Sequence, residues 1–570
     1  MLAASSIGSQ PDAIVIGAGT VGSVLAARLI SGDAPLRTLL LDSGAWGRNE
    51  HVQTPPLAMV TVPPPTVSWP GVALPPVTDV DCWRIPWRSP LPFQGLAYGV
   101  GGRSRFWGAY CVWPDLTGIG GTRAWPASVA KALDERYLPE AAELLGLGVA
   151  HSHLNGLLNT YLRERLKQGL THGHVGSLRP MQCWPTSPHI FRRSEDVDPR
   201  LEGSAGLEDL RLNLPMAVRI TEVRGGVNIV RFSAASHLLR AAETDGSHLD
   251  VRPGCHVVGL HIQGTCVRAV YTTLGRIDVP AGVPVVLAAG TIESARMVLN
   301  ATGSENHRRA GTGFSAHMRS NLTVRLSFPH RLAGAVPPGA AALAVRGVAG
   351  PDGPGFHHQI TAFAVGDIDP SSAQDLYLST PRRDVESLAM GHRTPPRHLV
   401  ITVASVGAMA TPSPGRISLA DETDEHGSRY AQVYFDVGEA DLRAWSAMDQ
   451  SADELLACLT DGEEVEVLRS GRFEPAAGRP LHQVVGHEER REPIGCGHHE
   501  MGSLPIGATD GPGTNTDGLA HGFDNLFIAG PAVFPSLDSA GPVLPSIAVT
   551  LRLADFLKRA ADCPSPAEHR

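Results

Sequence analysis

The chain has 570 residues, a formal net charge of −9, 42% hydrophobic residues and 18% charged residues. This balance is typical of a soluble globular protein rather than a disordered one, and the length predicts two or more lobes with separate cores. Lysine occurs only at Lys131, Lys167 and Lys558, and Lys and Arg form no dense run. Nucleic-acid binding, which needs a concentrated positive surface, is therefore disfavoured.

The eight cysteines are scattered, and none forms a CxxC pair. This spacing favours neither a zinc ribbon nor a thioredoxin-type site, and no metal site is expected. The first ten residues carry no positive cluster, and no apolar run approaches the about 18 residues of a membrane span. We expect a cytoplasmic protein without a membrane span, with thiols kept reduced.

The first elements in chain order form one compact unit. Residues 13–16 read as a strand, residues 17–22 (GAGTVG) as a glycine turn, residues 23–30 as a helix and residues 38–42 as a second strand. Strand, turn, helix and strand within about 30 residues predict the βαβ unit of a dinucleotide-binding fold.

The next segments alternate between irregular and regular structure. Residues 53–90 are rich in proline, which predicts a long extended connection. Residues 127–146 read as helical. Residues 230–300 form a strand-rich block that ends in a strand, a turn and a helix.

The C-terminal half combines a strand-rich block with a last glycine-punctuated segment. Residues 326–480 contain alternating strand patterns, followed within this block by a helix near 446–460. Residues 494–560 contain glycine turns, the strand NLFIAG and a final helix that begins near Pro545.

The glycine turn predicts a nucleotide site. Gly17 allows the tight turn, Gly19 lets the backbone approach a pyrophosphate, and Gly22 lets the helix pack close to the strand. The start of the helix, including Thr20 and Val21, offers N–H groups to phosphates. Asp42 ends the second strand, 20 residues after Gly22, where a carboxylate accepts hydrogen bonds from ribose hydroxyls. These residues alone predict FAD or NAD rather than NADP.

Segments farther along the chain distinguish between these cofactors. GAGTVG, GVGGRSRFWG (99–108), HHEMGSLPIG (498–507) and the C-terminal stretch DNLFIAGPAVFPSLDSAGPVLPSIAVTLRLAD occur in this order. The combination resembles the glucose–methanol–choline (GMC) oxidoreductase family, and AAGTIESARMVL (288–299) resembles the central strand-to-helix turn of that family. The resemblance spans almost the whole chain, and its C-terminal stretch is the most specific part.

The resemblance implies an α/β (α+β overall) architecture. A Rossmann-type FAD-binding domain would be formed by residues 1–130, 225–325 and 490–570. An inserted antiparallel-sheet substrate-binding domain with lid loops would be formed by residues 131–224 and 326–489. Within it, the Pro- and Gly-rich loops 331–356 and 369–397 are candidate lids or plain surface.

The resemblance also implies the contacts of FAD. Phe106 stands where some members attach FAD through a histidine, so we expect non-covalent FAD. The last helix would begin near the flavin edge that becomes negative on reduction, and a helix N-terminus stabilises an anion. By the same resemblance the expected contacts, besides the glycine turn and Asp42, are Gly101, Gly102, Ser104, Val257, Gly290, Gly530, Pro531 and Pro542.

His499 is the candidate general base. Alcohol oxidation removes a hydroxyl proton while hydride leaves the carbon for flavin N5, and a neutral histidine suits the proton step. His499 occupies the position of the family's catalytic histidine, and Ser503 replaces the commoner threonine. We expect His498 to point away as a supporting neighbour, since adjacent strand residues face opposite sides.

The second catalytic position departs from the family. His or Asn is usual there, whereas this sequence has Gly541. Three alternatives remain open. Asp538, Ser539 or a histidine of the substrate-binding domain supplies the contact; the enzyme works with one histidine; or the chemistry is not ordinary alcohol oxidation. His358 is a candidate to face the pocket, because alternation points only one of His357 and His358 inward.

The sequence thus predicts an FAD-dependent oxidoreductase. Its substrate would be an alcohol group of a sugar or natural-product-like small molecule, with O2 or another electron acceptor reoxidising the flavin. The alternative is a flavin-bound lyase or isomerase of the same fold without net redox turnover, because the family resemblance includes hydroxynitrile lyases and Gly541 weakens the redox site.

Overall fold

The computed structural model has a mixed α/β fold. It describes residues 10–47, 49–51, 82–93, 95–116, 125–147, 157–175, 178–179, 212–223, 226–301, 310–329, 339–350, 353–365, 397–410, 415–470, 472–507, 513–536 and 538–562. Most of the predicted connection 53–90 and of the predicted loop 369–397 lies outside these residues. Of the predicted loop 331–356, residues 331–338 and 351–352 lie outside them, whereas residues 339–348 form a strand, so the expectation of a continuous loop is wrong there.

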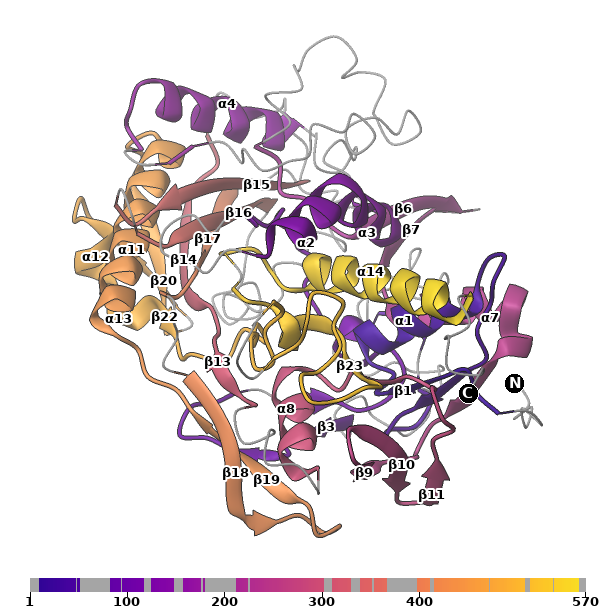
Figure 1. The fold of residues 1–570 in the computed structure, drawn as a ribbon. Helices are drawn as coiled ribbons and strands as arrows, with labels where there is room; N and C mark the ends of the chain where they lie inside the picture. Colours follow the sequence, from indigo (N-terminus) through magenta and orange to yellow (C-terminus); the bar gives the residue numbers. More distant parts are fainter. Residues whose placement is uncertain are drawn as a thin grey trace, which may run out of the picture.

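A five-stranded parallel sheet gathers strands from distant parts of the chain (Figure 1). All neighbouring strands are parallel, and the predicted βαβ unit is confirmed at its centre. The strand order is β23 (Leu526–Ile528), β12 (Val285–Leu287), β1 (Ala13–Ile16), β2 (Thr38–Leu41) and β8 (Leu249–Arg252).

Alternate residues of this sheet pack into two different cores. Val15 and Leu40 pack with helices α1 (Thr20–Ile30), α7 (Ala234–Asp245) and α14 (Val543–Asp562). Ile14 and Leu41 belong to a second core. Because side chains alternate along a strand, the fully apolar AIVI and TLLL can bury both faces.

The second core includes a three-stranded antiparallel sheet. Its strands are β9 (Val257–Gln263), β10 (Cys266–Thr272) and β11 (Gly275–Asp278), and β9 and β10 contribute residues such as Leu260 and Val270. The parallel sheet is therefore sandwiched between helices and a small antiparallel sheet.

A larger antiparallel sheet forms the other main body. It follows the order β15 (Gly339–Val348), β16 (Gly355–Val365), β17 (His398–Gly407), β14 (Met318–Ser327), β20 (Val465–Arg469) and β21 (Arg472–Pro475), and β22 (Arg491–Glu492) also pairs with β14. Helices α4 (Leu157–Thr171) and α11 (Glu439–Thr460) cover one of its faces. The other face is left for a cavity.

The remaining described elements connect these layers. The predicted helix at 127–146 is present, but a π-helical segment interrupts it. The elements are β3 (Trp83–Arg84), β4 (Trp87–Arg88), β5 (Leu96–Ala97), η3 (Gly102–Arg105), α2 (Ala127–Ala132), η4 (Leu133–Tyr137, the π-helical segment), α3 (Leu138–Leu145), β6 (Val218–Val223), β7 (Gly226–Arg231), η7 (Gly246–His248), α8 (Thr291–Asn300), β13 (Thr312–Phe314), β18 (Gly415–Thr423), β19 (Arg429–Tyr434), α12 (Leu481–Val484), α13 (His487–Arg490) and η11 (Gly530–Val533).

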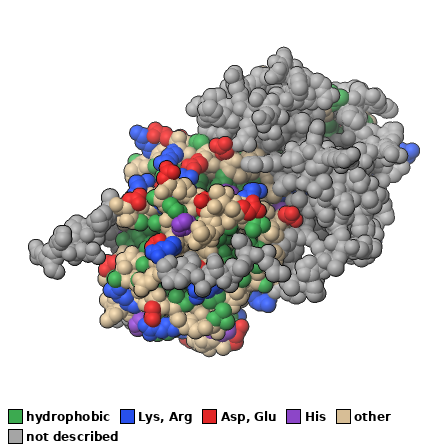
Figure 2. Space-filling view, turned by 90° about the vertical axis from the view of Figure 1, so that its right-hand side faces the viewer, with side chains coloured by type: hydrophobic (Ala, Val, Ile, Leu, Met, Phe, Trp, Pro, Cys, Tyr) green, Lys and Arg blue, Asp and Glu red, His purple; other side chains and the backbone are tan. Residues whose placement is uncertain are grey.

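The described surface carries mixed charge. Figure 2 shows acidic and basic side chains interspersed on the described part of one face. Among the described helices, none combines the length and the apolar character needed to cross a membrane.

Candidate active site

A cavity of about 680 Å³ lies between the parallel sheet and the open face of the antiparallel sheet. It extends from the glycine turn at the start of α1 to the segment that carries His499. Its lining includes Gly17, Gly19, Thr20, Val21, Asp42, Gly102, Ser104, Phe106, Val257, Gly290, Arg319, Gln359, His498, His499, Pro531, Gly541 and Pro542.

The glycine turn leaves an open backbone cradle at one end of the cavity. Gly17 has φ +97°, and a Cβ there would lie 2.8 Å from the Ala288 carbonyl oxygen. A Cβ on Gly22 would lie 1.8 Å from the Gly17 carbonyl oxygen, whereas one on Gly19 would meet nothing within 4 Å. Helix α1 begins after Gly19 without a side-chain cap or an acidic residue in its first turn. Its first N–H groups therefore suit an anionic group.

The segment at residues 99–105 folds directly over this turn. A Cβ on Gly102 (φ +49°) would lie 2.8 Å from the Gly19 Cα, and one on Gly101 (φ +88°) would lie 2.9 Å from the Ala235 Cβ. The Ser104 hydroxyl donates to the Gly101 carbonyl (2.6 Å) and accepts from the Ala234 N–H (2.9 Å). Ser104 thus lines the cavity, but its hydroxyl is already used to hold the segment in place.

Asp42 ties three parts of the cavity wall together. Its carboxylate accepts hydrogen bonds from the N–H groups of Ala18 (2.7 Å), Gly44 (2.8 Å) and Gly99 (2.7 Å). Burial raises the pKa of Asp42, while these three backbone donors act in the opposite direction. A carboxylate has about four lone-pair positions, so room for one ribose hydroxyl remains.

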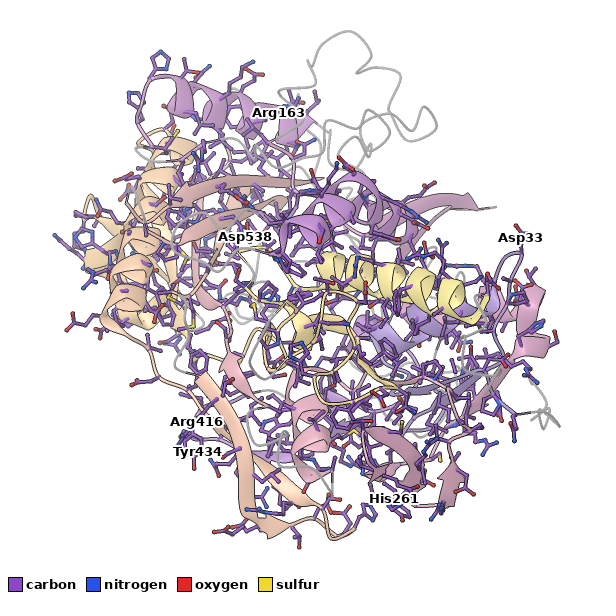
Figure 3. The ribbon with its side chains drawn as sticks, viewed as in Figure 1. Asp33, Arg163, His261, Arg416, Tyr434 and Asp538 are labelled. Atoms are coloured by element: carbon purple, nitrogen blue, oxygen red, sulfur yellow. The ribbon has the colours of Figure 1, made fainter. Side chains whose placement is uncertain are left out.

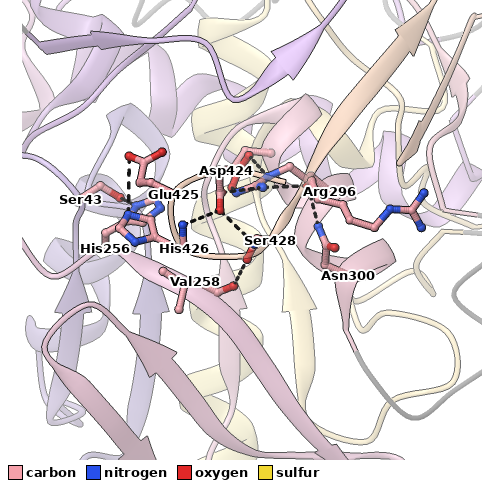
Figure 4. A network of polar contacts seen from close by, with 11 residues as sticks. Ser43, His256, Val258, Arg296, Asn300, Asp424, Glu425, His426 and Ser428 are labelled. Atoms are coloured by element: carbon pink, nitrogen blue, oxygen red, sulfur yellow. Dashed lines mark hydrogen bonds and ion pairs between the residues drawn. The ribbon is translucent and has the colours of Figure 1, made fainter. Parts of the chain in front are cut away.

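Beyond Asp42, a polar network closes the same end of the cavity (Figure 4). Ser43 and His256 form a hydrogen bond, and both line the cavity next to Val257. The His256 ring stacks against Tyr98 at 5.9 Å and contacts His426 at 5.2 Å. Tyr98 and His256 thus place two aromatic rings in the cavity wall beside Val257.

Arg296, on α8, connects this end of the cavity to the β18–β19 hairpin. It pairs with Glu293 (2.9 Å) and with Asp424 (3.1 Å), and it donates to the Arg429 carbonyl (2.9 Å). Burial raises the pKa of Glu293, whereas Arg296 lowers it. The ion pairs therefore fix α8 against the hairpin.

The other expected cofactor contacts fall into two groups. Thr20, Val21, Gly290, Pro531 and Pro542 line the cavity. Gly530 instead lies behind the lining: it has φ +80°, and a Cβ there would meet the Val21 side chain at 2.9 Å. Phe106 lines the cavity and lies 5.1 Å, ring to ring, from Trp83.

His499 is paired with a second histidine that the sequence analysis did not single out. The Nδ1 atoms of His317 and His499 lie 2.9 Å apart, and the two rings are nearly perpendicular. His317 precedes β14 and is buried, and its Nε2 lies 2.7 Å from the backbone carbonyl oxygen of Asp538. No local pattern predicts this pair, because 182 residues separate its members.

The contacts of His317 determine where the protons lie. A carbonyl oxygen only accepts, so His317 Nε2 carries the proton and donates to it. Burial lowers the pKa of His317 to about 4, so its ring is neutral and its Nδ1 is an acceptor. His499 Nδ1 must then be the donor of the 2.9 Å bond. Burial, followed by the proximity of His317, lowers the pKa of His499 well below its ordinary value, which leaves an unprotonated Nε2 on its other side.

His498 also faces the cavity, so the expectation that it points away is wrong. The expectation assumed a strand, whereas residues 498–500 are irregular and His498 has φ +55°. Its ring lies 5.5 Å from Trp83, and burial lowers its pKa to about 4.

The sequence left several candidates to compensate for Gly541. A Cβ on Gly541 would lie 3.8 Å from His499 Cε1 and 3.9 Å from Nε2, so the glycine leaves space beside the unprotonated nitrogen.

Asp538 is buried in the interior (Figure 3), where its carboxylate pairs with Arg346 at 2.6 Å. Ser539 is fully buried and bonds His357. Neither side chain lines the cavity, so the geometry does not support a direct substrate contact from either.

The expectation that His358 faces the pocket is wrong. It is fully buried on the opposite face of the antiparallel sheet, between Ser405 (2.8 Å) and Ser451 of α11 (3.0 Å). Alternation places His357 on the cavity side instead, where its Nε2 lies 3.0 Å from Gln359 Nε2. Gln359 is the residue of this strand that reaches the cavity.

A family model described as GMC oxidoreductase matches residues 411–550, a segment that contains His498, His499 and Gly541. No curated protein matches the chain.

Proposed function

The chain belongs to the GMC oxidoreductase family, and from this premise we propose that it oxidises the alcohol group of a small molecule with non-covalently bound FAD. The observation that carries the proposal is the unprotonated His499 Nε2, which lies on the wall of the same cavity as the glycine cradle.

The residues present fit FAD at four places. The open Gly19 cradle and the uncapped start of α1 would receive the pyrophosphate, and Asp42 would hold a ribose hydroxyl. The backbone at Val257 would meet the adenine. At the other end, Pro542 and Val543 line the cavity at the start of α14, where the N-terminal dipole favours negative charge.

We propose non-covalent attachment because Phe106 has no nucleophilic atom and stands where a covalent link would form. The division into a Rossmann-type cofactor domain and an inserted substrate domain is likewise our proposal. Its support is that all five strands of the parallel sheet fall within residues 1–130, 225–325 and 490–570. Strand β14 crosses the proposed limit at residue 325 and joins the antiparallel sheet.

When bound, FAD would supply the acceptor for the hydride that leaves the carbinol carbon. His499 Nε2 takes the hydroxyl proton as the carbonyl forms. His317 holds the His499 ring in the required tautomer and orientation through the Nδ1–Nδ1 hydrogen bond. The Asp538 carbonyl in turn fixes His317.

The space at Gly541 suits an enzyme that works with one histidine and a bulkier substrate. In the relatives' pattern a side chain at this position would touch the substrate oxygen. Here Gln359 lines the same cavity, and its Nε2 lies 3.0 Å from the Nε2 of His357. We propose a sugar or natural-product-like substrate and O2 or another acceptor for reoxidation.

The test is an anaerobic titration of the purified flavoprotein with a panel of alcohols. Bleaching of the flavin together with formation of the aldehyde or ketone supports the proposal. Product formation without bleaching would identify the lyase or isomerase alternative. Protein that neither retains nor binds FAD would refute the cofactor assignment itself.

A further inference from the structure

One face of the antiparallel sheet forms a polar floor to the cavity. In adjacent strands, Asn321 pairs with Ala404, which pairs with Gln359. Two residues along the strands in one direction, Arg319 pairs with Val406. Two residues along in the other direction, Thr402 pairs with Thr361. The members of this floor that line the cavity are Arg319, Asn321, Gln359, Thr361, Thr402, Ala404 and Val406.

The floor follows from strand alternation. The intervening residues Leu322, Ile360 and Val403 are buried in the core on the other side of the sheet. Side chains of neighbouring strands on one face are about 5 Å apart. The small Ala404 therefore leaves a slot between the two carboxamides of Asn321 and Gln359.

Arg319 stands out among the charged groups of the cavity. Its Nε is buried without a hydrogen-bond partner and forms a long ion pair, 3.5 Å, with Glu492, which also lines the cavity. None of the described residues accepts a hydrogen bond from the Arg319 guanidinium. Of the Arg319 side chain, 28% is exposed. By contrast, Arg103 donates to Glu500 at 2.8 Å and to the Gly95 carbonyl at 2.8 Å. A buried N–H donor without an acceptor is unfavourable, so the Nε of Arg319 favours a ligand that supplies one.

The neighbouring groups define which acceptor fits. Glu492 accepts a hydrogen bond from the Asn321 amide, and the Gln359 amide is directed to His357. Both carboxamide oxygens thus remain as acceptors for hydroxyl groups. The planar fork of Arg319 matches a carboxylate, which accepts two parallel N–H bonds.

We propose that the substrate is a hydroxy acid whose carboxylate binds Arg319 while its alcohol group lies at His499. This inference rests on the proposed function and specifies its substrate class. Arg319 follows His317 by two residues, so their Cα atoms are about 7 Å apart. The acid and the carbinol can therefore belong to one small molecule. The carboxylate is unchanged in the reaction, since only the carbinol loses a proton and a hydride.

Binding of benzoate and benzamide to the FAD-loaded protein tests the inference without turnover. Trp83 and Trp107 line the cavity, so quenching of tryptophan fluorescence reports occupancy. We expect benzoate to bind at least about tenfold more tightly than benzamide, as a charge-assisted bond implies. R319M should remove this preference, and R319K should retain part of it. Equal binding of the two probes to the wild-type protein would overturn the inference.

R325M is the matched control. Arg325 lies on the same strand and pairs with Glu466 at 2.6 Å, but it does not line the cavity. We expect its preference for benzoate to equal that of the wild type. Loss of the preference in R325M as in R319M would show a general effect of charge and would overturn the role of Arg319.

Flavin reduction separates this inference from the proposed function. With 4-(hydroxymethyl)benzoate and 4-(hydroxymethyl)benzamide as anaerobic donors, we expect the acid to reduce the flavin at least about tenfold more efficiently. Equal reduction by the amide, or reduction only by other neutral alcohols, would refute the hydroxy-acid assignment and leave alcohol oxidation intact. If no alcohol reduces the flavin, the proposed function fails, and the benzoate preference still decides the role of Arg319.

Discussion

The Nδ1 atom of His499 donates a hydrogen bond of 2.9 Å to the Nδ1 atom of His317. The other nitrogen of His317 donates to the Asp538 carbonyl, so when both rings are neutral the two histidines can adopt only one pair of tautomers. The consequence is a lone pair on His499 Nε2, directed to the side where Gly541 leaves space. The geometry thus gives the proposed base a fixed direction before any substrate binds.

Replacement of His317 tests this arrangement. H317F should lower kcat by about 10- to 100-fold with little change in KM, because the His499 ring loses its orienting acceptor. H317Q is the matched control, since a carboxamide oxygen can accept from His499 and its N–H can donate to the Asp538 carbonyl. Steady-state kinetics and flavin content of both variants check the prediction. Equal losses in H317F and H317Q would indicate a packing role only.

The lowered pKa of His499 has a direct consequence for the pH profile. A base with a pKa well below 6.5 stays unprotonated as the pH falls through 6.5. We therefore expect kcat/KM for a neutral alcohol to show no inflection near that pH and to decline only in more acidic buffer. An inflection near 6.5, measured with reversible pH jumps, would contradict the assignment of His499.

Stability should also depend on pH through His317. Its pKa is about 4 when folded and about 6.5 when unfolded, so the unfolded chain binds more protons between these values. The stabilisation is complete above pH 6.5 and is lost as the pH falls toward 4, by up to about 3 kcal/mol. The difference in unfolding free energy between wild type and H317Q should be constant above pH 6.5 and should shift against the wild type, by up to about 3 kcal/mol, as the pH falls from 6.5 to 4. A constant difference across this range would contradict the prediction.

Two neighbouring glycines should respond differently to the same change. G19A should leave the unfolding free energy within about 0.5 kcal/mol of the wild type, because its Cβ meets nothing within 4 Å. Its flavin content should fall, since the new methyl group enters the cradle. G22A should destabilise the fold by about 1–3 kcal/mol, because its Cβ would lie 1.8 Å from the Gly17 oxygen. Full flavin content in G19A would argue against a pyrophosphate at this turn.

The parts of the site that were predictable from the sequence depend on local geometry. The turn at Gly17, Gly19 and Gly22 was recognisable because strand, turn and helix lie within about 30 residues and each glycine has a steric reason. His499 was identified through its surrounding motif. Both features are encoded by adjacent residues.

The remaining features depend on packing between distant segments. Alternation showed that one of His357 and His358 faces the cavity side, but it could not say which, because both faces of β16 are buried. His317 is brought to His499 by the antiparallel bridge between Ser315 and Met501, which are far apart in the sequence. Arg319 and Asn321 alternate in MRSNLTV, a pattern that could have indicated a polar face but not what that face lines.

The most direct test is single-turnover flavin reduction in wild type and H499A under anaerobic conditions, with an alcohol found active in the panel. The account predicts that both proteins bind FAD, that the wild type bleaches on mixing, and that H499A bleaches about 100- to 10,000-fold more slowly. Undiminished bleaching in FAD-loaded H499A would contradict the assignment of His499 as the base.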